Sequence, residues 1–251
     1  MNNLEKFSSP VISICIVSYN SGHYLQQCLG SLGEAPRNIP LEIIVADNHS
    51  EDGTLDILKD QYPGISLIIN PDNEGYAKAN NQGIKKAKGK YLLLLNNDTL
   101  VHKDALQNLL AFARKSPDVG VVGSKLLNID GTLQMSCYRF PTITNAIKEY
   151  WFGKKGLFEK FAPEGEKPTT VDSVVGAAFL ITPEALKRAG MLDERYFAYV
   201  EDIDYCRQVW KKGLKVYYLP SSVITHYHGA TFKKRADEGE QWKKLIPSSK
   251  I

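Results

Sequence analysis

Short apolar runs alternate with segments of helical periodicity along the first half of the chain, and polar turn residues end most of these runs. The most apolar run, Tyr-Leu-Leu-Leu-Leu at residues 91–95, is followed directly by Asn-Asn-Asp. This alternation indicates βαβ units and a largely parallel sheet, and continuous apolar runs are typical of strands covered on both faces. The predicted strands span residues 11–18, 41–46, 65–69, 91–95 and 119–123, and the predicted helices span residues 23–32, 55–62, 76–87 and 103–115.

The pattern is less regular after residue 126. Residues 137–170 mix aromatic side chains with basic residues and prolines, without a clean period. Because neither a repeat nor an interdomain linker is visible, we expect one domain over residues 1–251. The later predicted elements are a strand over residues 171–182, a short helix from Pro183, a helix over residues 202–212 that ends at Gly213, and strands over residues 215–219 and 223–226.

Composition excludes several classes of protein. The net charge of +3 over 251 residues is too small to indicate a nucleic-acid-binding protein. The four cysteines are scattered, which excludes zinc-ligand spacing and predicts reduced thiols in a cytosolic protein. No apolar stretch approaches the roughly 20 residues that span a bilayer. We therefore expect a soluble or peripheral protein.

Polar clusters follow three of the predicted strands. They are Ser18-Tyr19-Asn20, Asp47-Asn48 and Asn96-Asn97-Asp98. In open parallel sheets, ligands bind beyond the carboxyl ends of the strands. One cluster alone is typical of an ordinary turn, since Asp and Asn favour turns. Three clusters at one edge of the sheet favour a shared site.

Asp98 is the most informative carboxylate, because it directly follows the apolar strand and has amide neighbours. Such an oxygen-rich setting suits Mg²⁺ or Mn²⁺ held together with phosphate oxygens. A helix cap is the alternative interpretation of Asp98. His226, at the end of a later apolar strand, is either a metal ligand or a surface residue.

Glu201 and Asp202 begin the predicted helix over residues 202–212. Acidic residues in a first helical turn are expected from the helix dipole alone. The preceding aromatic residues would however enclose these carboxylates and raise the pKa values, as a general base requires. Those aromatic residues are Tyr196, Phe197 and Tyr199. The chain contains no GxGxxG, GxxxxGK[ST] or GxSxG motif, which argues against dinucleotide oxidoreductases, P-loop enzymes and α/β-hydrolases.

Six sequence motifs occur in an order that resembles glycosyltransferase family 2, and most closely its rhamnosyltransferase-like branch in bacterial polysaccharide synthesis. The resemblance runs from Val11 to about Thr231 and is poor between Gln134 and Thr170. The motifs are VSYNSG, ADNHSEDGT, NPDNEGYAKANNQGIKKAKGKYLLLLNNDT, VVGAAFLI, GMLDERYFAYVEDIDYCRQVWKKG and ITHYHGAT.

The resemblance implies a GT-A fold, which is a Rossmann-like, largely parallel sheet with helices on both faces and a C-terminal acceptor-side region. It places the nucleotide-sugar half at residues 11–125, the acceptor-side half at 126–231 and a basic tail at 232–251. Asp47 matches the carboxylate that contacts the pyrimidine base, and Asn97 lies near the ribose. The donor-binding residues that it implies are Val17, Ser18, Tyr19, Asp47, Asn80, Asn97 and Asp98.

The resemblance also implies catalytic and metal-binding roles. Asp202 matches the catalytic base, with Glu201 beside it as an acceptor contact. Asp98 and His226 match the ligands of Mg²⁺ or Mn²⁺. The chain departs from the family pattern at Asn96-Asn97-Asp98, because many members carry aspartate where this chain has asparagine. Asp98 is therefore the one charged group that this motif supplies.

The implied function is that of an inverting glycosyltransferase that moves a sugar, with dTDP-rhamnose the favoured donor, to a saccharide or lipid-linked saccharide. A UDP-sugar donor (GlcNAc, galactose or glucose) is the first alternative. A non-catalytic nucleotide-sugar-binding module is the second, and a glycoside hydrolase, which leaves Asp47 and Asp98 unexplained, is the third. We expect a cytoplasmic protein. Two interpretations stay open for the aromatic, basic residues 138–161 and the basic tail. They contact the inner face of the plasma membrane peripherally, or they form a packed subdomain.

Overall fold

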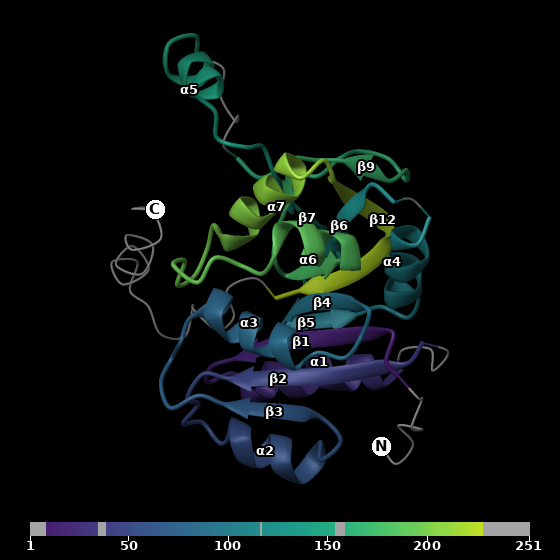
Figure 1. Cartoon of the computed structure of the whole chain (residues 1–251). Coiled ribbons are helices and arrows are strands. Elements are labelled where there is room, and N and C mark those ends of the chain that lie inside the picture. Colours follow the sequence, from purple (N-terminus) through teal and green to yellow (C-terminus); the bar gives the residue numbers. More distant parts are fainter. Residues whose placement is uncertain (1–8, 35–38, 116, 154–158, 228–251) are drawn as a thin grey trace.

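Figure 1 shows a central sheet with helices packed on both of its faces and one helix, α5, standing away from the rest. The computed structural model describes residues 9–34, 39–115, 117–153 and 159–227. The helices are α1 (Gly22–Glu34), α2 (Thr54–Gln61), α3 (Tyr76–Lys86), α4 (Ala105–Ala113), α5 (Ile143–Tyr150), α6 (Pro183–Ala189) and α7 (Glu201–Lys211). The strands are β1 (Ile12–Ser18), β2 (Leu41–Asp47), β3 (Ser66–Ile69), β4 (Tyr91–Asn96), β5 (Thr99–Val101), β6 (Val119–Leu127), β7 (Leu133–Gln134), β8 (Cys137–Tyr138), β9 (Thr169–Thr170), β10 (Ser173–Val174), β11 (Ala178–Ile181) and β12 (Lys215–His226).

The main sheet has the strand order β3-β2-β1-β4-β11-β6-β12-β5. Strands β1 to β4 are parallel, and β6 is parallel to β12, whereas β11 runs antiparallel between β4 and β6. The largely parallel sheet predicted from the sequence is confirmed. Because β2 lies on one side of β1 and β4 on the other, the chain order reverses at the β1–β4 pair. Ligands of open α/β sheets bind at the carboxyl ends of strands at such a reversal.

The central strand β4 is buried on both faces. Its side chains alternate, so that Leu93 and Leu95 pack with α1 and α4, whereas Leu92 and Leu94 pack with α3 and α7. All four leucines are at most 3% exposed. Burying one leucine stabilises a fold by about 1.5–3 kcal/mol. Asn97 and Asp98 follow β4 directly, so they are attached to a rigidly held strand.

Four of the sequence-based expectations about individual elements were wrong or incomplete. The strand expected over residues 171–182 is two strands, because β10 pairs with β8 in a separate sheet while β11 joins the main sheet. The strands expected over residues 215–219 and 223–226 are one strand, β12, with an irregularity between Leu219 and Val223. The helix expected over residues 103–115 begins at Ala105. The short strand β5 and the helix α5 were not predicted.

Gly213 ends α7 in the left-handed conformation, with φ 74°, as the sequence predicts. The predicted reduced thiols are also confirmed, since all four cysteines are free and buried. Burial raises the pKa of Cys15, Cys28 and Cys137 to about 12, so these groups are protonated at neutral pH. Within the described ranges, none of the helices has the length and apolar character needed to cross a membrane.

Candidate active site

The three predicted polar clusters lie at the same edge of the sheet. In the parallel register, Ser18 at the end of β1 lies opposite Asp47 at the end of β2, and Val17 lies opposite Asn96 at the end of β4. Asn97 and Asp98 follow β4 directly. The structure therefore brings these residues together at the point where the chain order reverses.

Side-chain hydrogen bonds hold the loop after β1 in place. Asn97 Nδ2 donates to Ser21 Oγ over 2.6 Å, and Ser21 Oγ lies 3.4 Å from Ser18 Oγ. Asn20 adopts a left-handed conformation with φ 48°, and its Oδ1 accepts from the Glu51 N–H over 2.7 Å. These bonds connect the loops that follow β1, β2 and β4, so the edge is preorganised.

Asp47 and Asn80 are buried with an unused acceptor each. Asp47 has no exposed surface, and its Oδ2 accepts from the Ser50 N–H over 2.8 Å. Asn80, on α3, is 1% exposed and donates from Nδ2 to the Tyr76 carbonyl over 3.0 Å. Among the described residues, Asp47 Oδ1 and Asn80 Oδ1 have no hydrogen-bond partner. Buried acceptors without a donor are rare, so both atoms are candidates for ligand contacts.

Asp98 and His226 form a buried pair. Asp98 Oδ1 lies 3.3 Å from His226 Nε2, and the side chains are each 6% exposed. His226 Nδ1 lies 2.7 Å from Gln134 Oε1, which can only accept, so Nδ1 carries a proton. In the neutral ring, the Nε2 lone pair therefore faces the Asp98 carboxylate and the amide of Asn96, whose Nδ2 lies 3.3 Å away.

The short strand β5 creates this pair. It runs antiparallel to β12 and places Thr99 opposite His226, and the Tyr227 N–H donates to the Asp98 carbonyl over 2.9 Å. Two acceptors that face each other at 3.3 Å fit a shared cation. A carboxylate and an imidazole are suitable donors for Mn²⁺, and Mg²⁺ also uses few protein ligands together with substrate phosphates. In the described parts of the chain no third Asp, Glu, His or Cys joins them as a metal-ligand group.

Glu201 and Asp202 begin α7 after a strained turn. Tyr199 and Val200 have φ angles of 68° and 73°, which β-branched and aromatic residues rarely adopt. Asp202 Oδ2 accepts from the Gly176 N–H over 2.9 Å, and Oδ1 accepts from the Ile203 N–H over 2.8 Å. These two backbone N–H groups therefore fix both oxygens of Asp202.

Burial shifts the titration of both carboxyl groups. Burial raises the pKa of Glu201 to about 8, and the charge of Asp202 adds to this rise. Burial also raises the pKa of Asp202, but the N–H groups of Gly176 and Ile203 and the charge of Lys160 oppose it. The proton that the pair retains at neutral pH therefore resides on Glu201, and Asp202 is the more acidic member.

The charges of both groups of carboxylates act on Tyr76 and Tyr199. The Tyr76 hydroxyl donates to the Gly176 carbonyl over 2.9 Å. Burial raises the pKa of Tyr76 well above its usual value, and the charges of Glu201, Asp202 and Asp98 contribute. Burial and then the charges of Glu201 and Asp98 raise the pKa of Tyr199. The pKa values of both phenols are therefore raised by charges at the start of α7 and by the charge of Asp98.

The aromatic residues before α7 contribute unequally to the site. After burial, the charge of Glu201 makes the largest contribution to the raised pKa of Tyr199, whereas the strongest charge effects on the pKa of Tyr196 come from Asp204 and Asp193. Phe197 instead accepts a bond at its carbonyl from the Tyr76 N–H over 2.6 Å. The backbone of Phe197 thereby joins α3 to the turn that precedes α7.

Sequence reasoning missed several residues at this site. Tyr76 and Gly176 lie within the quoted motifs, so their position there was a usable signal. Gln134, Tyr138 and Lys160 lie where the resemblance is poor; no motif marked Gln134, and Tyr138 and Lys160 were noted only as part of the aromatic, basic residues 138–161. His228 and the basic tail at residues 232–251 fall outside the described residues.

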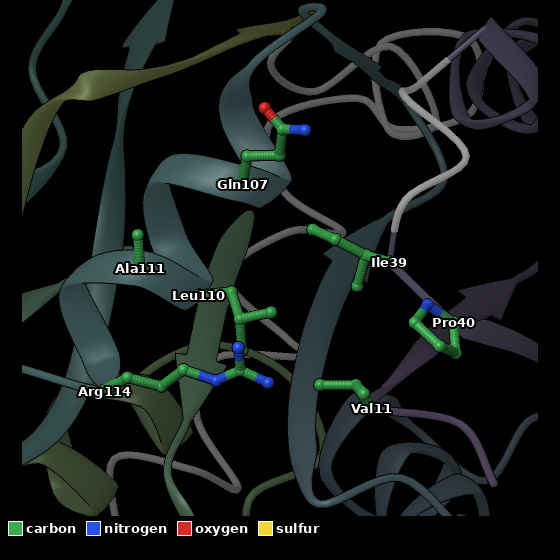
Figure 2. Close-up of a pocket in the computed structure, with 7 residues that line it drawn as sticks. All are labelled: Val11, Ile39, Pro40, Gln107, Leu110, Ala111 and Arg114. Atoms are coloured by element: carbon green, nitrogen blue, oxygen red, sulfur yellow. The ribbon is translucent and has the colours of Figure 1, made fainter.

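The pocket in Figure 2 lies at the opposite end of the sheet. Val11 precedes β1 and lines this pocket, whereas Ser18 ends β1 at the candidate site. Seven strand residues span about 20 Å. The pocket is lined mostly by apolar side chains together with Gln107 and Arg114 from the α4 region, so it is separate from the carboxylates.

The chain belongs to glycosyl transferase family 2, whose family model matches residues 13–187. It is 26% identical over 234 residues to the N-acetylglucosaminyl-diphospho-decaprenol L-rhamnosyltransferase of Mycobacterium tuberculosis, covering 86% of this chain and 76% of the relative. It is 27% identical over 243 residues to the O-antigen biosynthesis protein RfbC of Myxococcus xanthus, covering 93% of this chain and 19% of that protein. The predicted family is confirmed.

Solved structures show the same fold. The chain resembles GalNAc-T7 with UDP, GalNAc and Mn²⁺ at a TM-score of 0.66 and 20% identity, covering 87% of this chain and 44% of that one. It resembles Staphylococcus aureus TarS at a TM-score of 0.60 and 17% identity, covering 94% and 70%. These neighbours are GT-A glycosyltransferases, so the predicted GT-A fold is confirmed.

Proposed function

We propose that this protein is an inverting glycosyltransferase that moves a sugar from a nucleotide-diphosphate sugar to an acceptor hydroxyl in cell-surface polysaccharide synthesis. The observation that carries the proposal is the arrangement of two buried acidic groups at one edge of the sheet. Asp98 lies beside His226 at the end of β4, and Glu201 and Asp202 lie at the start of α7, with Tyr76 sensing both groups. One group suits a diphosphate and its metal, and the other suits an acceptor hydroxyl.

The nucleotide of the donor would bind across the ends of β1, β2 and β4. The unused Asp47 Oδ1 accepts from the base, beside Val17, Ser18 and Tyr19. Asn97 lies near the ribose. Asn80 Oδ1 is the second unused acceptor, on the helix that borders the diphosphate.

Asp98 and His226 would hold Mg²⁺ or Mn²⁺ together with the diphosphate. The bound metal would offset the charge that develops on the leaving diphosphate. Its support here is the pair of acceptors that face each other at 3.3 Å. Gln134 fixes the His226 ring through Nδ1, and Nε2 lies on the side of Asp98, where the metal would be held.

Asp202 would take the proton from the acceptor hydroxyl as that oxygen attacks the anomeric carbon. The attack displaces the diphosphate from the opposite face of the sugar, so the configuration inverts. Asp202 suits this role because two backbone N–H groups hold its oxygens and keep it the more acidic carboxyl of the pair. Glu201, with a pKa raised to about 8, is protonated at neutral pH and donates a hydrogen bond to the acceptor.

For the donor we favour dTDP-rhamnose, because the mycobacterial relative is named a rhamnosyltransferase. That name also supports a lipid-linked saccharide acceptor, which would bring the protein to the cytoplasmic face of the plasma membrane. UDP-GlcNAc, UDP-galactose and UDP-glucose are the alternative donors. A nucleotide-sugar-binding module without activity is the remaining alternative, kept open by the asparagines before Asp98.

Calorimetry with dTDP, UDP, GDP and ADP, each with and without Mn²⁺ or Mg²⁺, tests the donor site. The proposal predicts that one pyrimidine diphosphate binds and that its affinity rises with the metal. Absence of binding by every nucleotide would contradict the proposal. Binding without subsequent transfer from any sugar of the matching nucleotide would favour the binding module.

A further inference from the structure

Helix α5 presents large apolar side chains to solvent. Ile143, Ile147 and Trp151 recur every four residues and are 81%, 40% and 81% exposed, and Phe152 is 75% exposed. The Trp151 N–H donates to the Ile147 carbonyl over 2.8 Å, so the helical hydrogen bonding continues to Trp151. Residues spaced by four lie on one helical face. These three residues, together with the exposed Phe152 that directly follows Trp151, are named the α5 face below.

The α5 face lies at the tip of a protrusion whose base is tied together. Figure 1 shows α5 clear of the sheet and of the other helices. At the base, the Cys137 N–H donates to the Phe161 carbonyl over 2.8 Å, and the Phe161 N–H donates to the Cys137 carbonyl over 2.9 Å. The Arg139 guanidinium lies 4.4 Å from the centre of the Phe161 ring. We call this base the stem.

The stem is anchored beside the candidate catalytic carboxylates. The Phe140 N–H donates to Asp172 Oδ2 over 2.8 Å, which fixes the stem to the body. Lys160 Nζ lies 5.4 Å from the centre of the Tyr138 ring. The stem strand β8 pairs with β10, which ends two residues before Gly176, the backbone donor to Asp202 Oδ2, and the charge of Lys160 opposes the rise in the pKa of Asp202. An acceptor bound at Asp202 would therefore border the stem, on the side from which the α5 face projects.

The positive charge of residues 138–161 favours an anionic partner. Residues 138–161 contain five basic residues and two acidic ones, and two of the basic residues, Arg139 and Lys160, lie in the stem. A basic segment with an apolar helical face that carries Trp and Phe is typical of a helix lying in a lipid interface. Trp is enriched at the level of the lipid headgroups.

The size of the face argues against a stable protein partner. Aromatic side chains bury about 150–250 Å² each, so Trp151 and Phe152 together offer roughly 300–500 Å². A stable protein–protein interface needs about 800 Å² per partner. An interfacial helix needs only a shallow apolar contact supplemented by basic residues.

We propose that the α5 face inserts into the headgroup region of an anionic lipid bilayer, so that the stem holds a membrane-linked acceptor at Asp202. The acceptor part of this inference rests on the proposed function, whereas the membrane contact is independent of it. The bilayer then lies beyond α5, and the body of the protein projects into the aqueous phase.

Flotation of the full chain with vesicles tests the inference directly. We expect binding to vesicles of mixed phosphatidylcholine and phosphatidylglycerol, and weaker binding to phosphatidylcholine alone. Trp151→Ser together with Phe152→Ser should reduce partitioning at least about tenfold, because two buried aromatic side chains are lost. Lys148→Glu should weaken binding to the anionic vesicles about fivefold or more and leave the neutral vesicles unaffected.

Ile69→Ser is the matched control, because Ile69 is 52% exposed on the opposite edge strand β3. It should bind vesicles like the unaltered chain. Equal vesicle binding by the Trp151→Ser/Phe152→Ser variant, or no binding by the unaltered chain, would overturn the inference. Concentration-dependent dimers that the double variant loses would reassign the face to a second copy.

Nucleotide calorimetry on the same variants separates this inference from the proposed function. The double variant should bind the nucleotide diphosphate normally, because the α5 face is remote from the ends of β1 and β2. A chain that binds nucleotide but no vesicle refutes the membrane inference alone. A chain that binds vesicles through α5 but no nucleotide refutes the donor site alone.

Discussion

Asp98 and His226 face each other across the β5–β12 pair, with Asp98 Oδ1 3.3 Å from His226 Nε2, although they lie far apart in the sequence. Gln134 fixes the ring from behind through Nδ1 over 2.7 Å. This hydrogen bond sets which nitrogen carries the proton, so the lone pair of Nε2 points toward the carboxylate.

Gln134→Ala should therefore weaken the Mn²⁺-dependent binding of the nucleotide diphosphate about 10–100-fold, as loss of a residue that orients a metal ligand does. Asp98→Ala should weaken it at least as much. Calorimetry at fixed Mn²⁺ measures both effects, and Asp130→Ala, at an exposed acidic residue of the β6–β7 turn, is the control. Unchanged affinity for Asp98→Ala would remove that carboxylate from the metal site.

Glu201→Gln should retain activity near neutral pH. Burial raises the pKa of Glu201 to about 8, so the group is protonated at pH 7 and glutamine replaces it as a neutral donor. We expect kcat within about tenfold of the unaltered enzyme, the scale of one hydrogen bond. As the pH rises through about 8, Glu201 ionises and loses its donated bond, so activity falls.

The glutamine variant cannot ionise, and its rate profile should lack this alkaline decline. Initial rates of nucleotide release between pH 6 and about 9 test the point. An alkaline decline that persists unchanged in Glu201→Gln would assign it to another group.

Lys160→Met should move the acid limb of the pH–rate profile to higher pH. Burial raises the pKa of Asp202, and the Lys160 ammonium opposes that rise. Without the cation the pKa of Asp202 rises further, so a higher pH is needed to obtain the deprotonated base. Lys90→Met, at an exposed lysine beside the amino end of β4, should leave the profile unchanged. A shift to lower pH for Lys160→Met would contradict the electrostatic role.

Gly75→Ala should destabilise the fold more than Gly131→Ala. Both glycines have positive φ angles, 80° and 81°. A Cβ at Gly75 would lie 2.4 Å from the Phe197 carbonyl oxygen, whereas a Cβ at Gly131 would have no neighbour within 4 Å. Gly131→Ala should cost about 1–2 kcal/mol of backbone strain. Gly75→Ala should cost about 1–3 kcal/mol more because of the clash. Equal unfolding midpoints in urea would argue against close packing of α3 on the α7 turn.

Sequence patterns predicted the helices and strands correctly where the local pattern and the tertiary structure agree. The run of leucines in β4 predicts a buried strand because both faces are covered, and Gly213 ends α7 as its conformational freedom predicts. The failures lie where distant residues decide the structure. The strand expected over residues 171–182 divides because Ser173 and Val174 pair with β8.

In the candidate site, too, local pattern predicts some residues, whereas others depend on residues distant in the sequence. The position of Asp47 and Asp98 at strand ends follows from local pattern and is seen in the structure, whereas their roles stay predictions. Gln134 hydrogen-bonds His226, and the charge of Asp202 acts on Tyr138 as the charge of Lys160 acts on Asp202, although these residues are distant in the sequence. No local pattern marks such residues, and a single sequence does not show which distant side chains they meet.

The most direct test of the central claim separates chemistry from donor binding in one substitution, Asp202→Asn. The assay measures release of the nucleotide diphosphate from dTDP-rhamnose, or from the sugar of the nucleotide that calorimetry selects, with a synthetic N-acetylglucosaminyl-diphospho-lipid as acceptor. Asparagine keeps the shape, and its one side-chain oxygen can accept the Gly176 N–H although not also the Ile203 N–H, but it cannot take a proton. We predict that donor affinity stays within about twofold while transfer falls about 100–10,000-fold, the contribution of a general base. Transfer at the rate of the unaltered enzyme would contradict the assignment of Asp202 as the base.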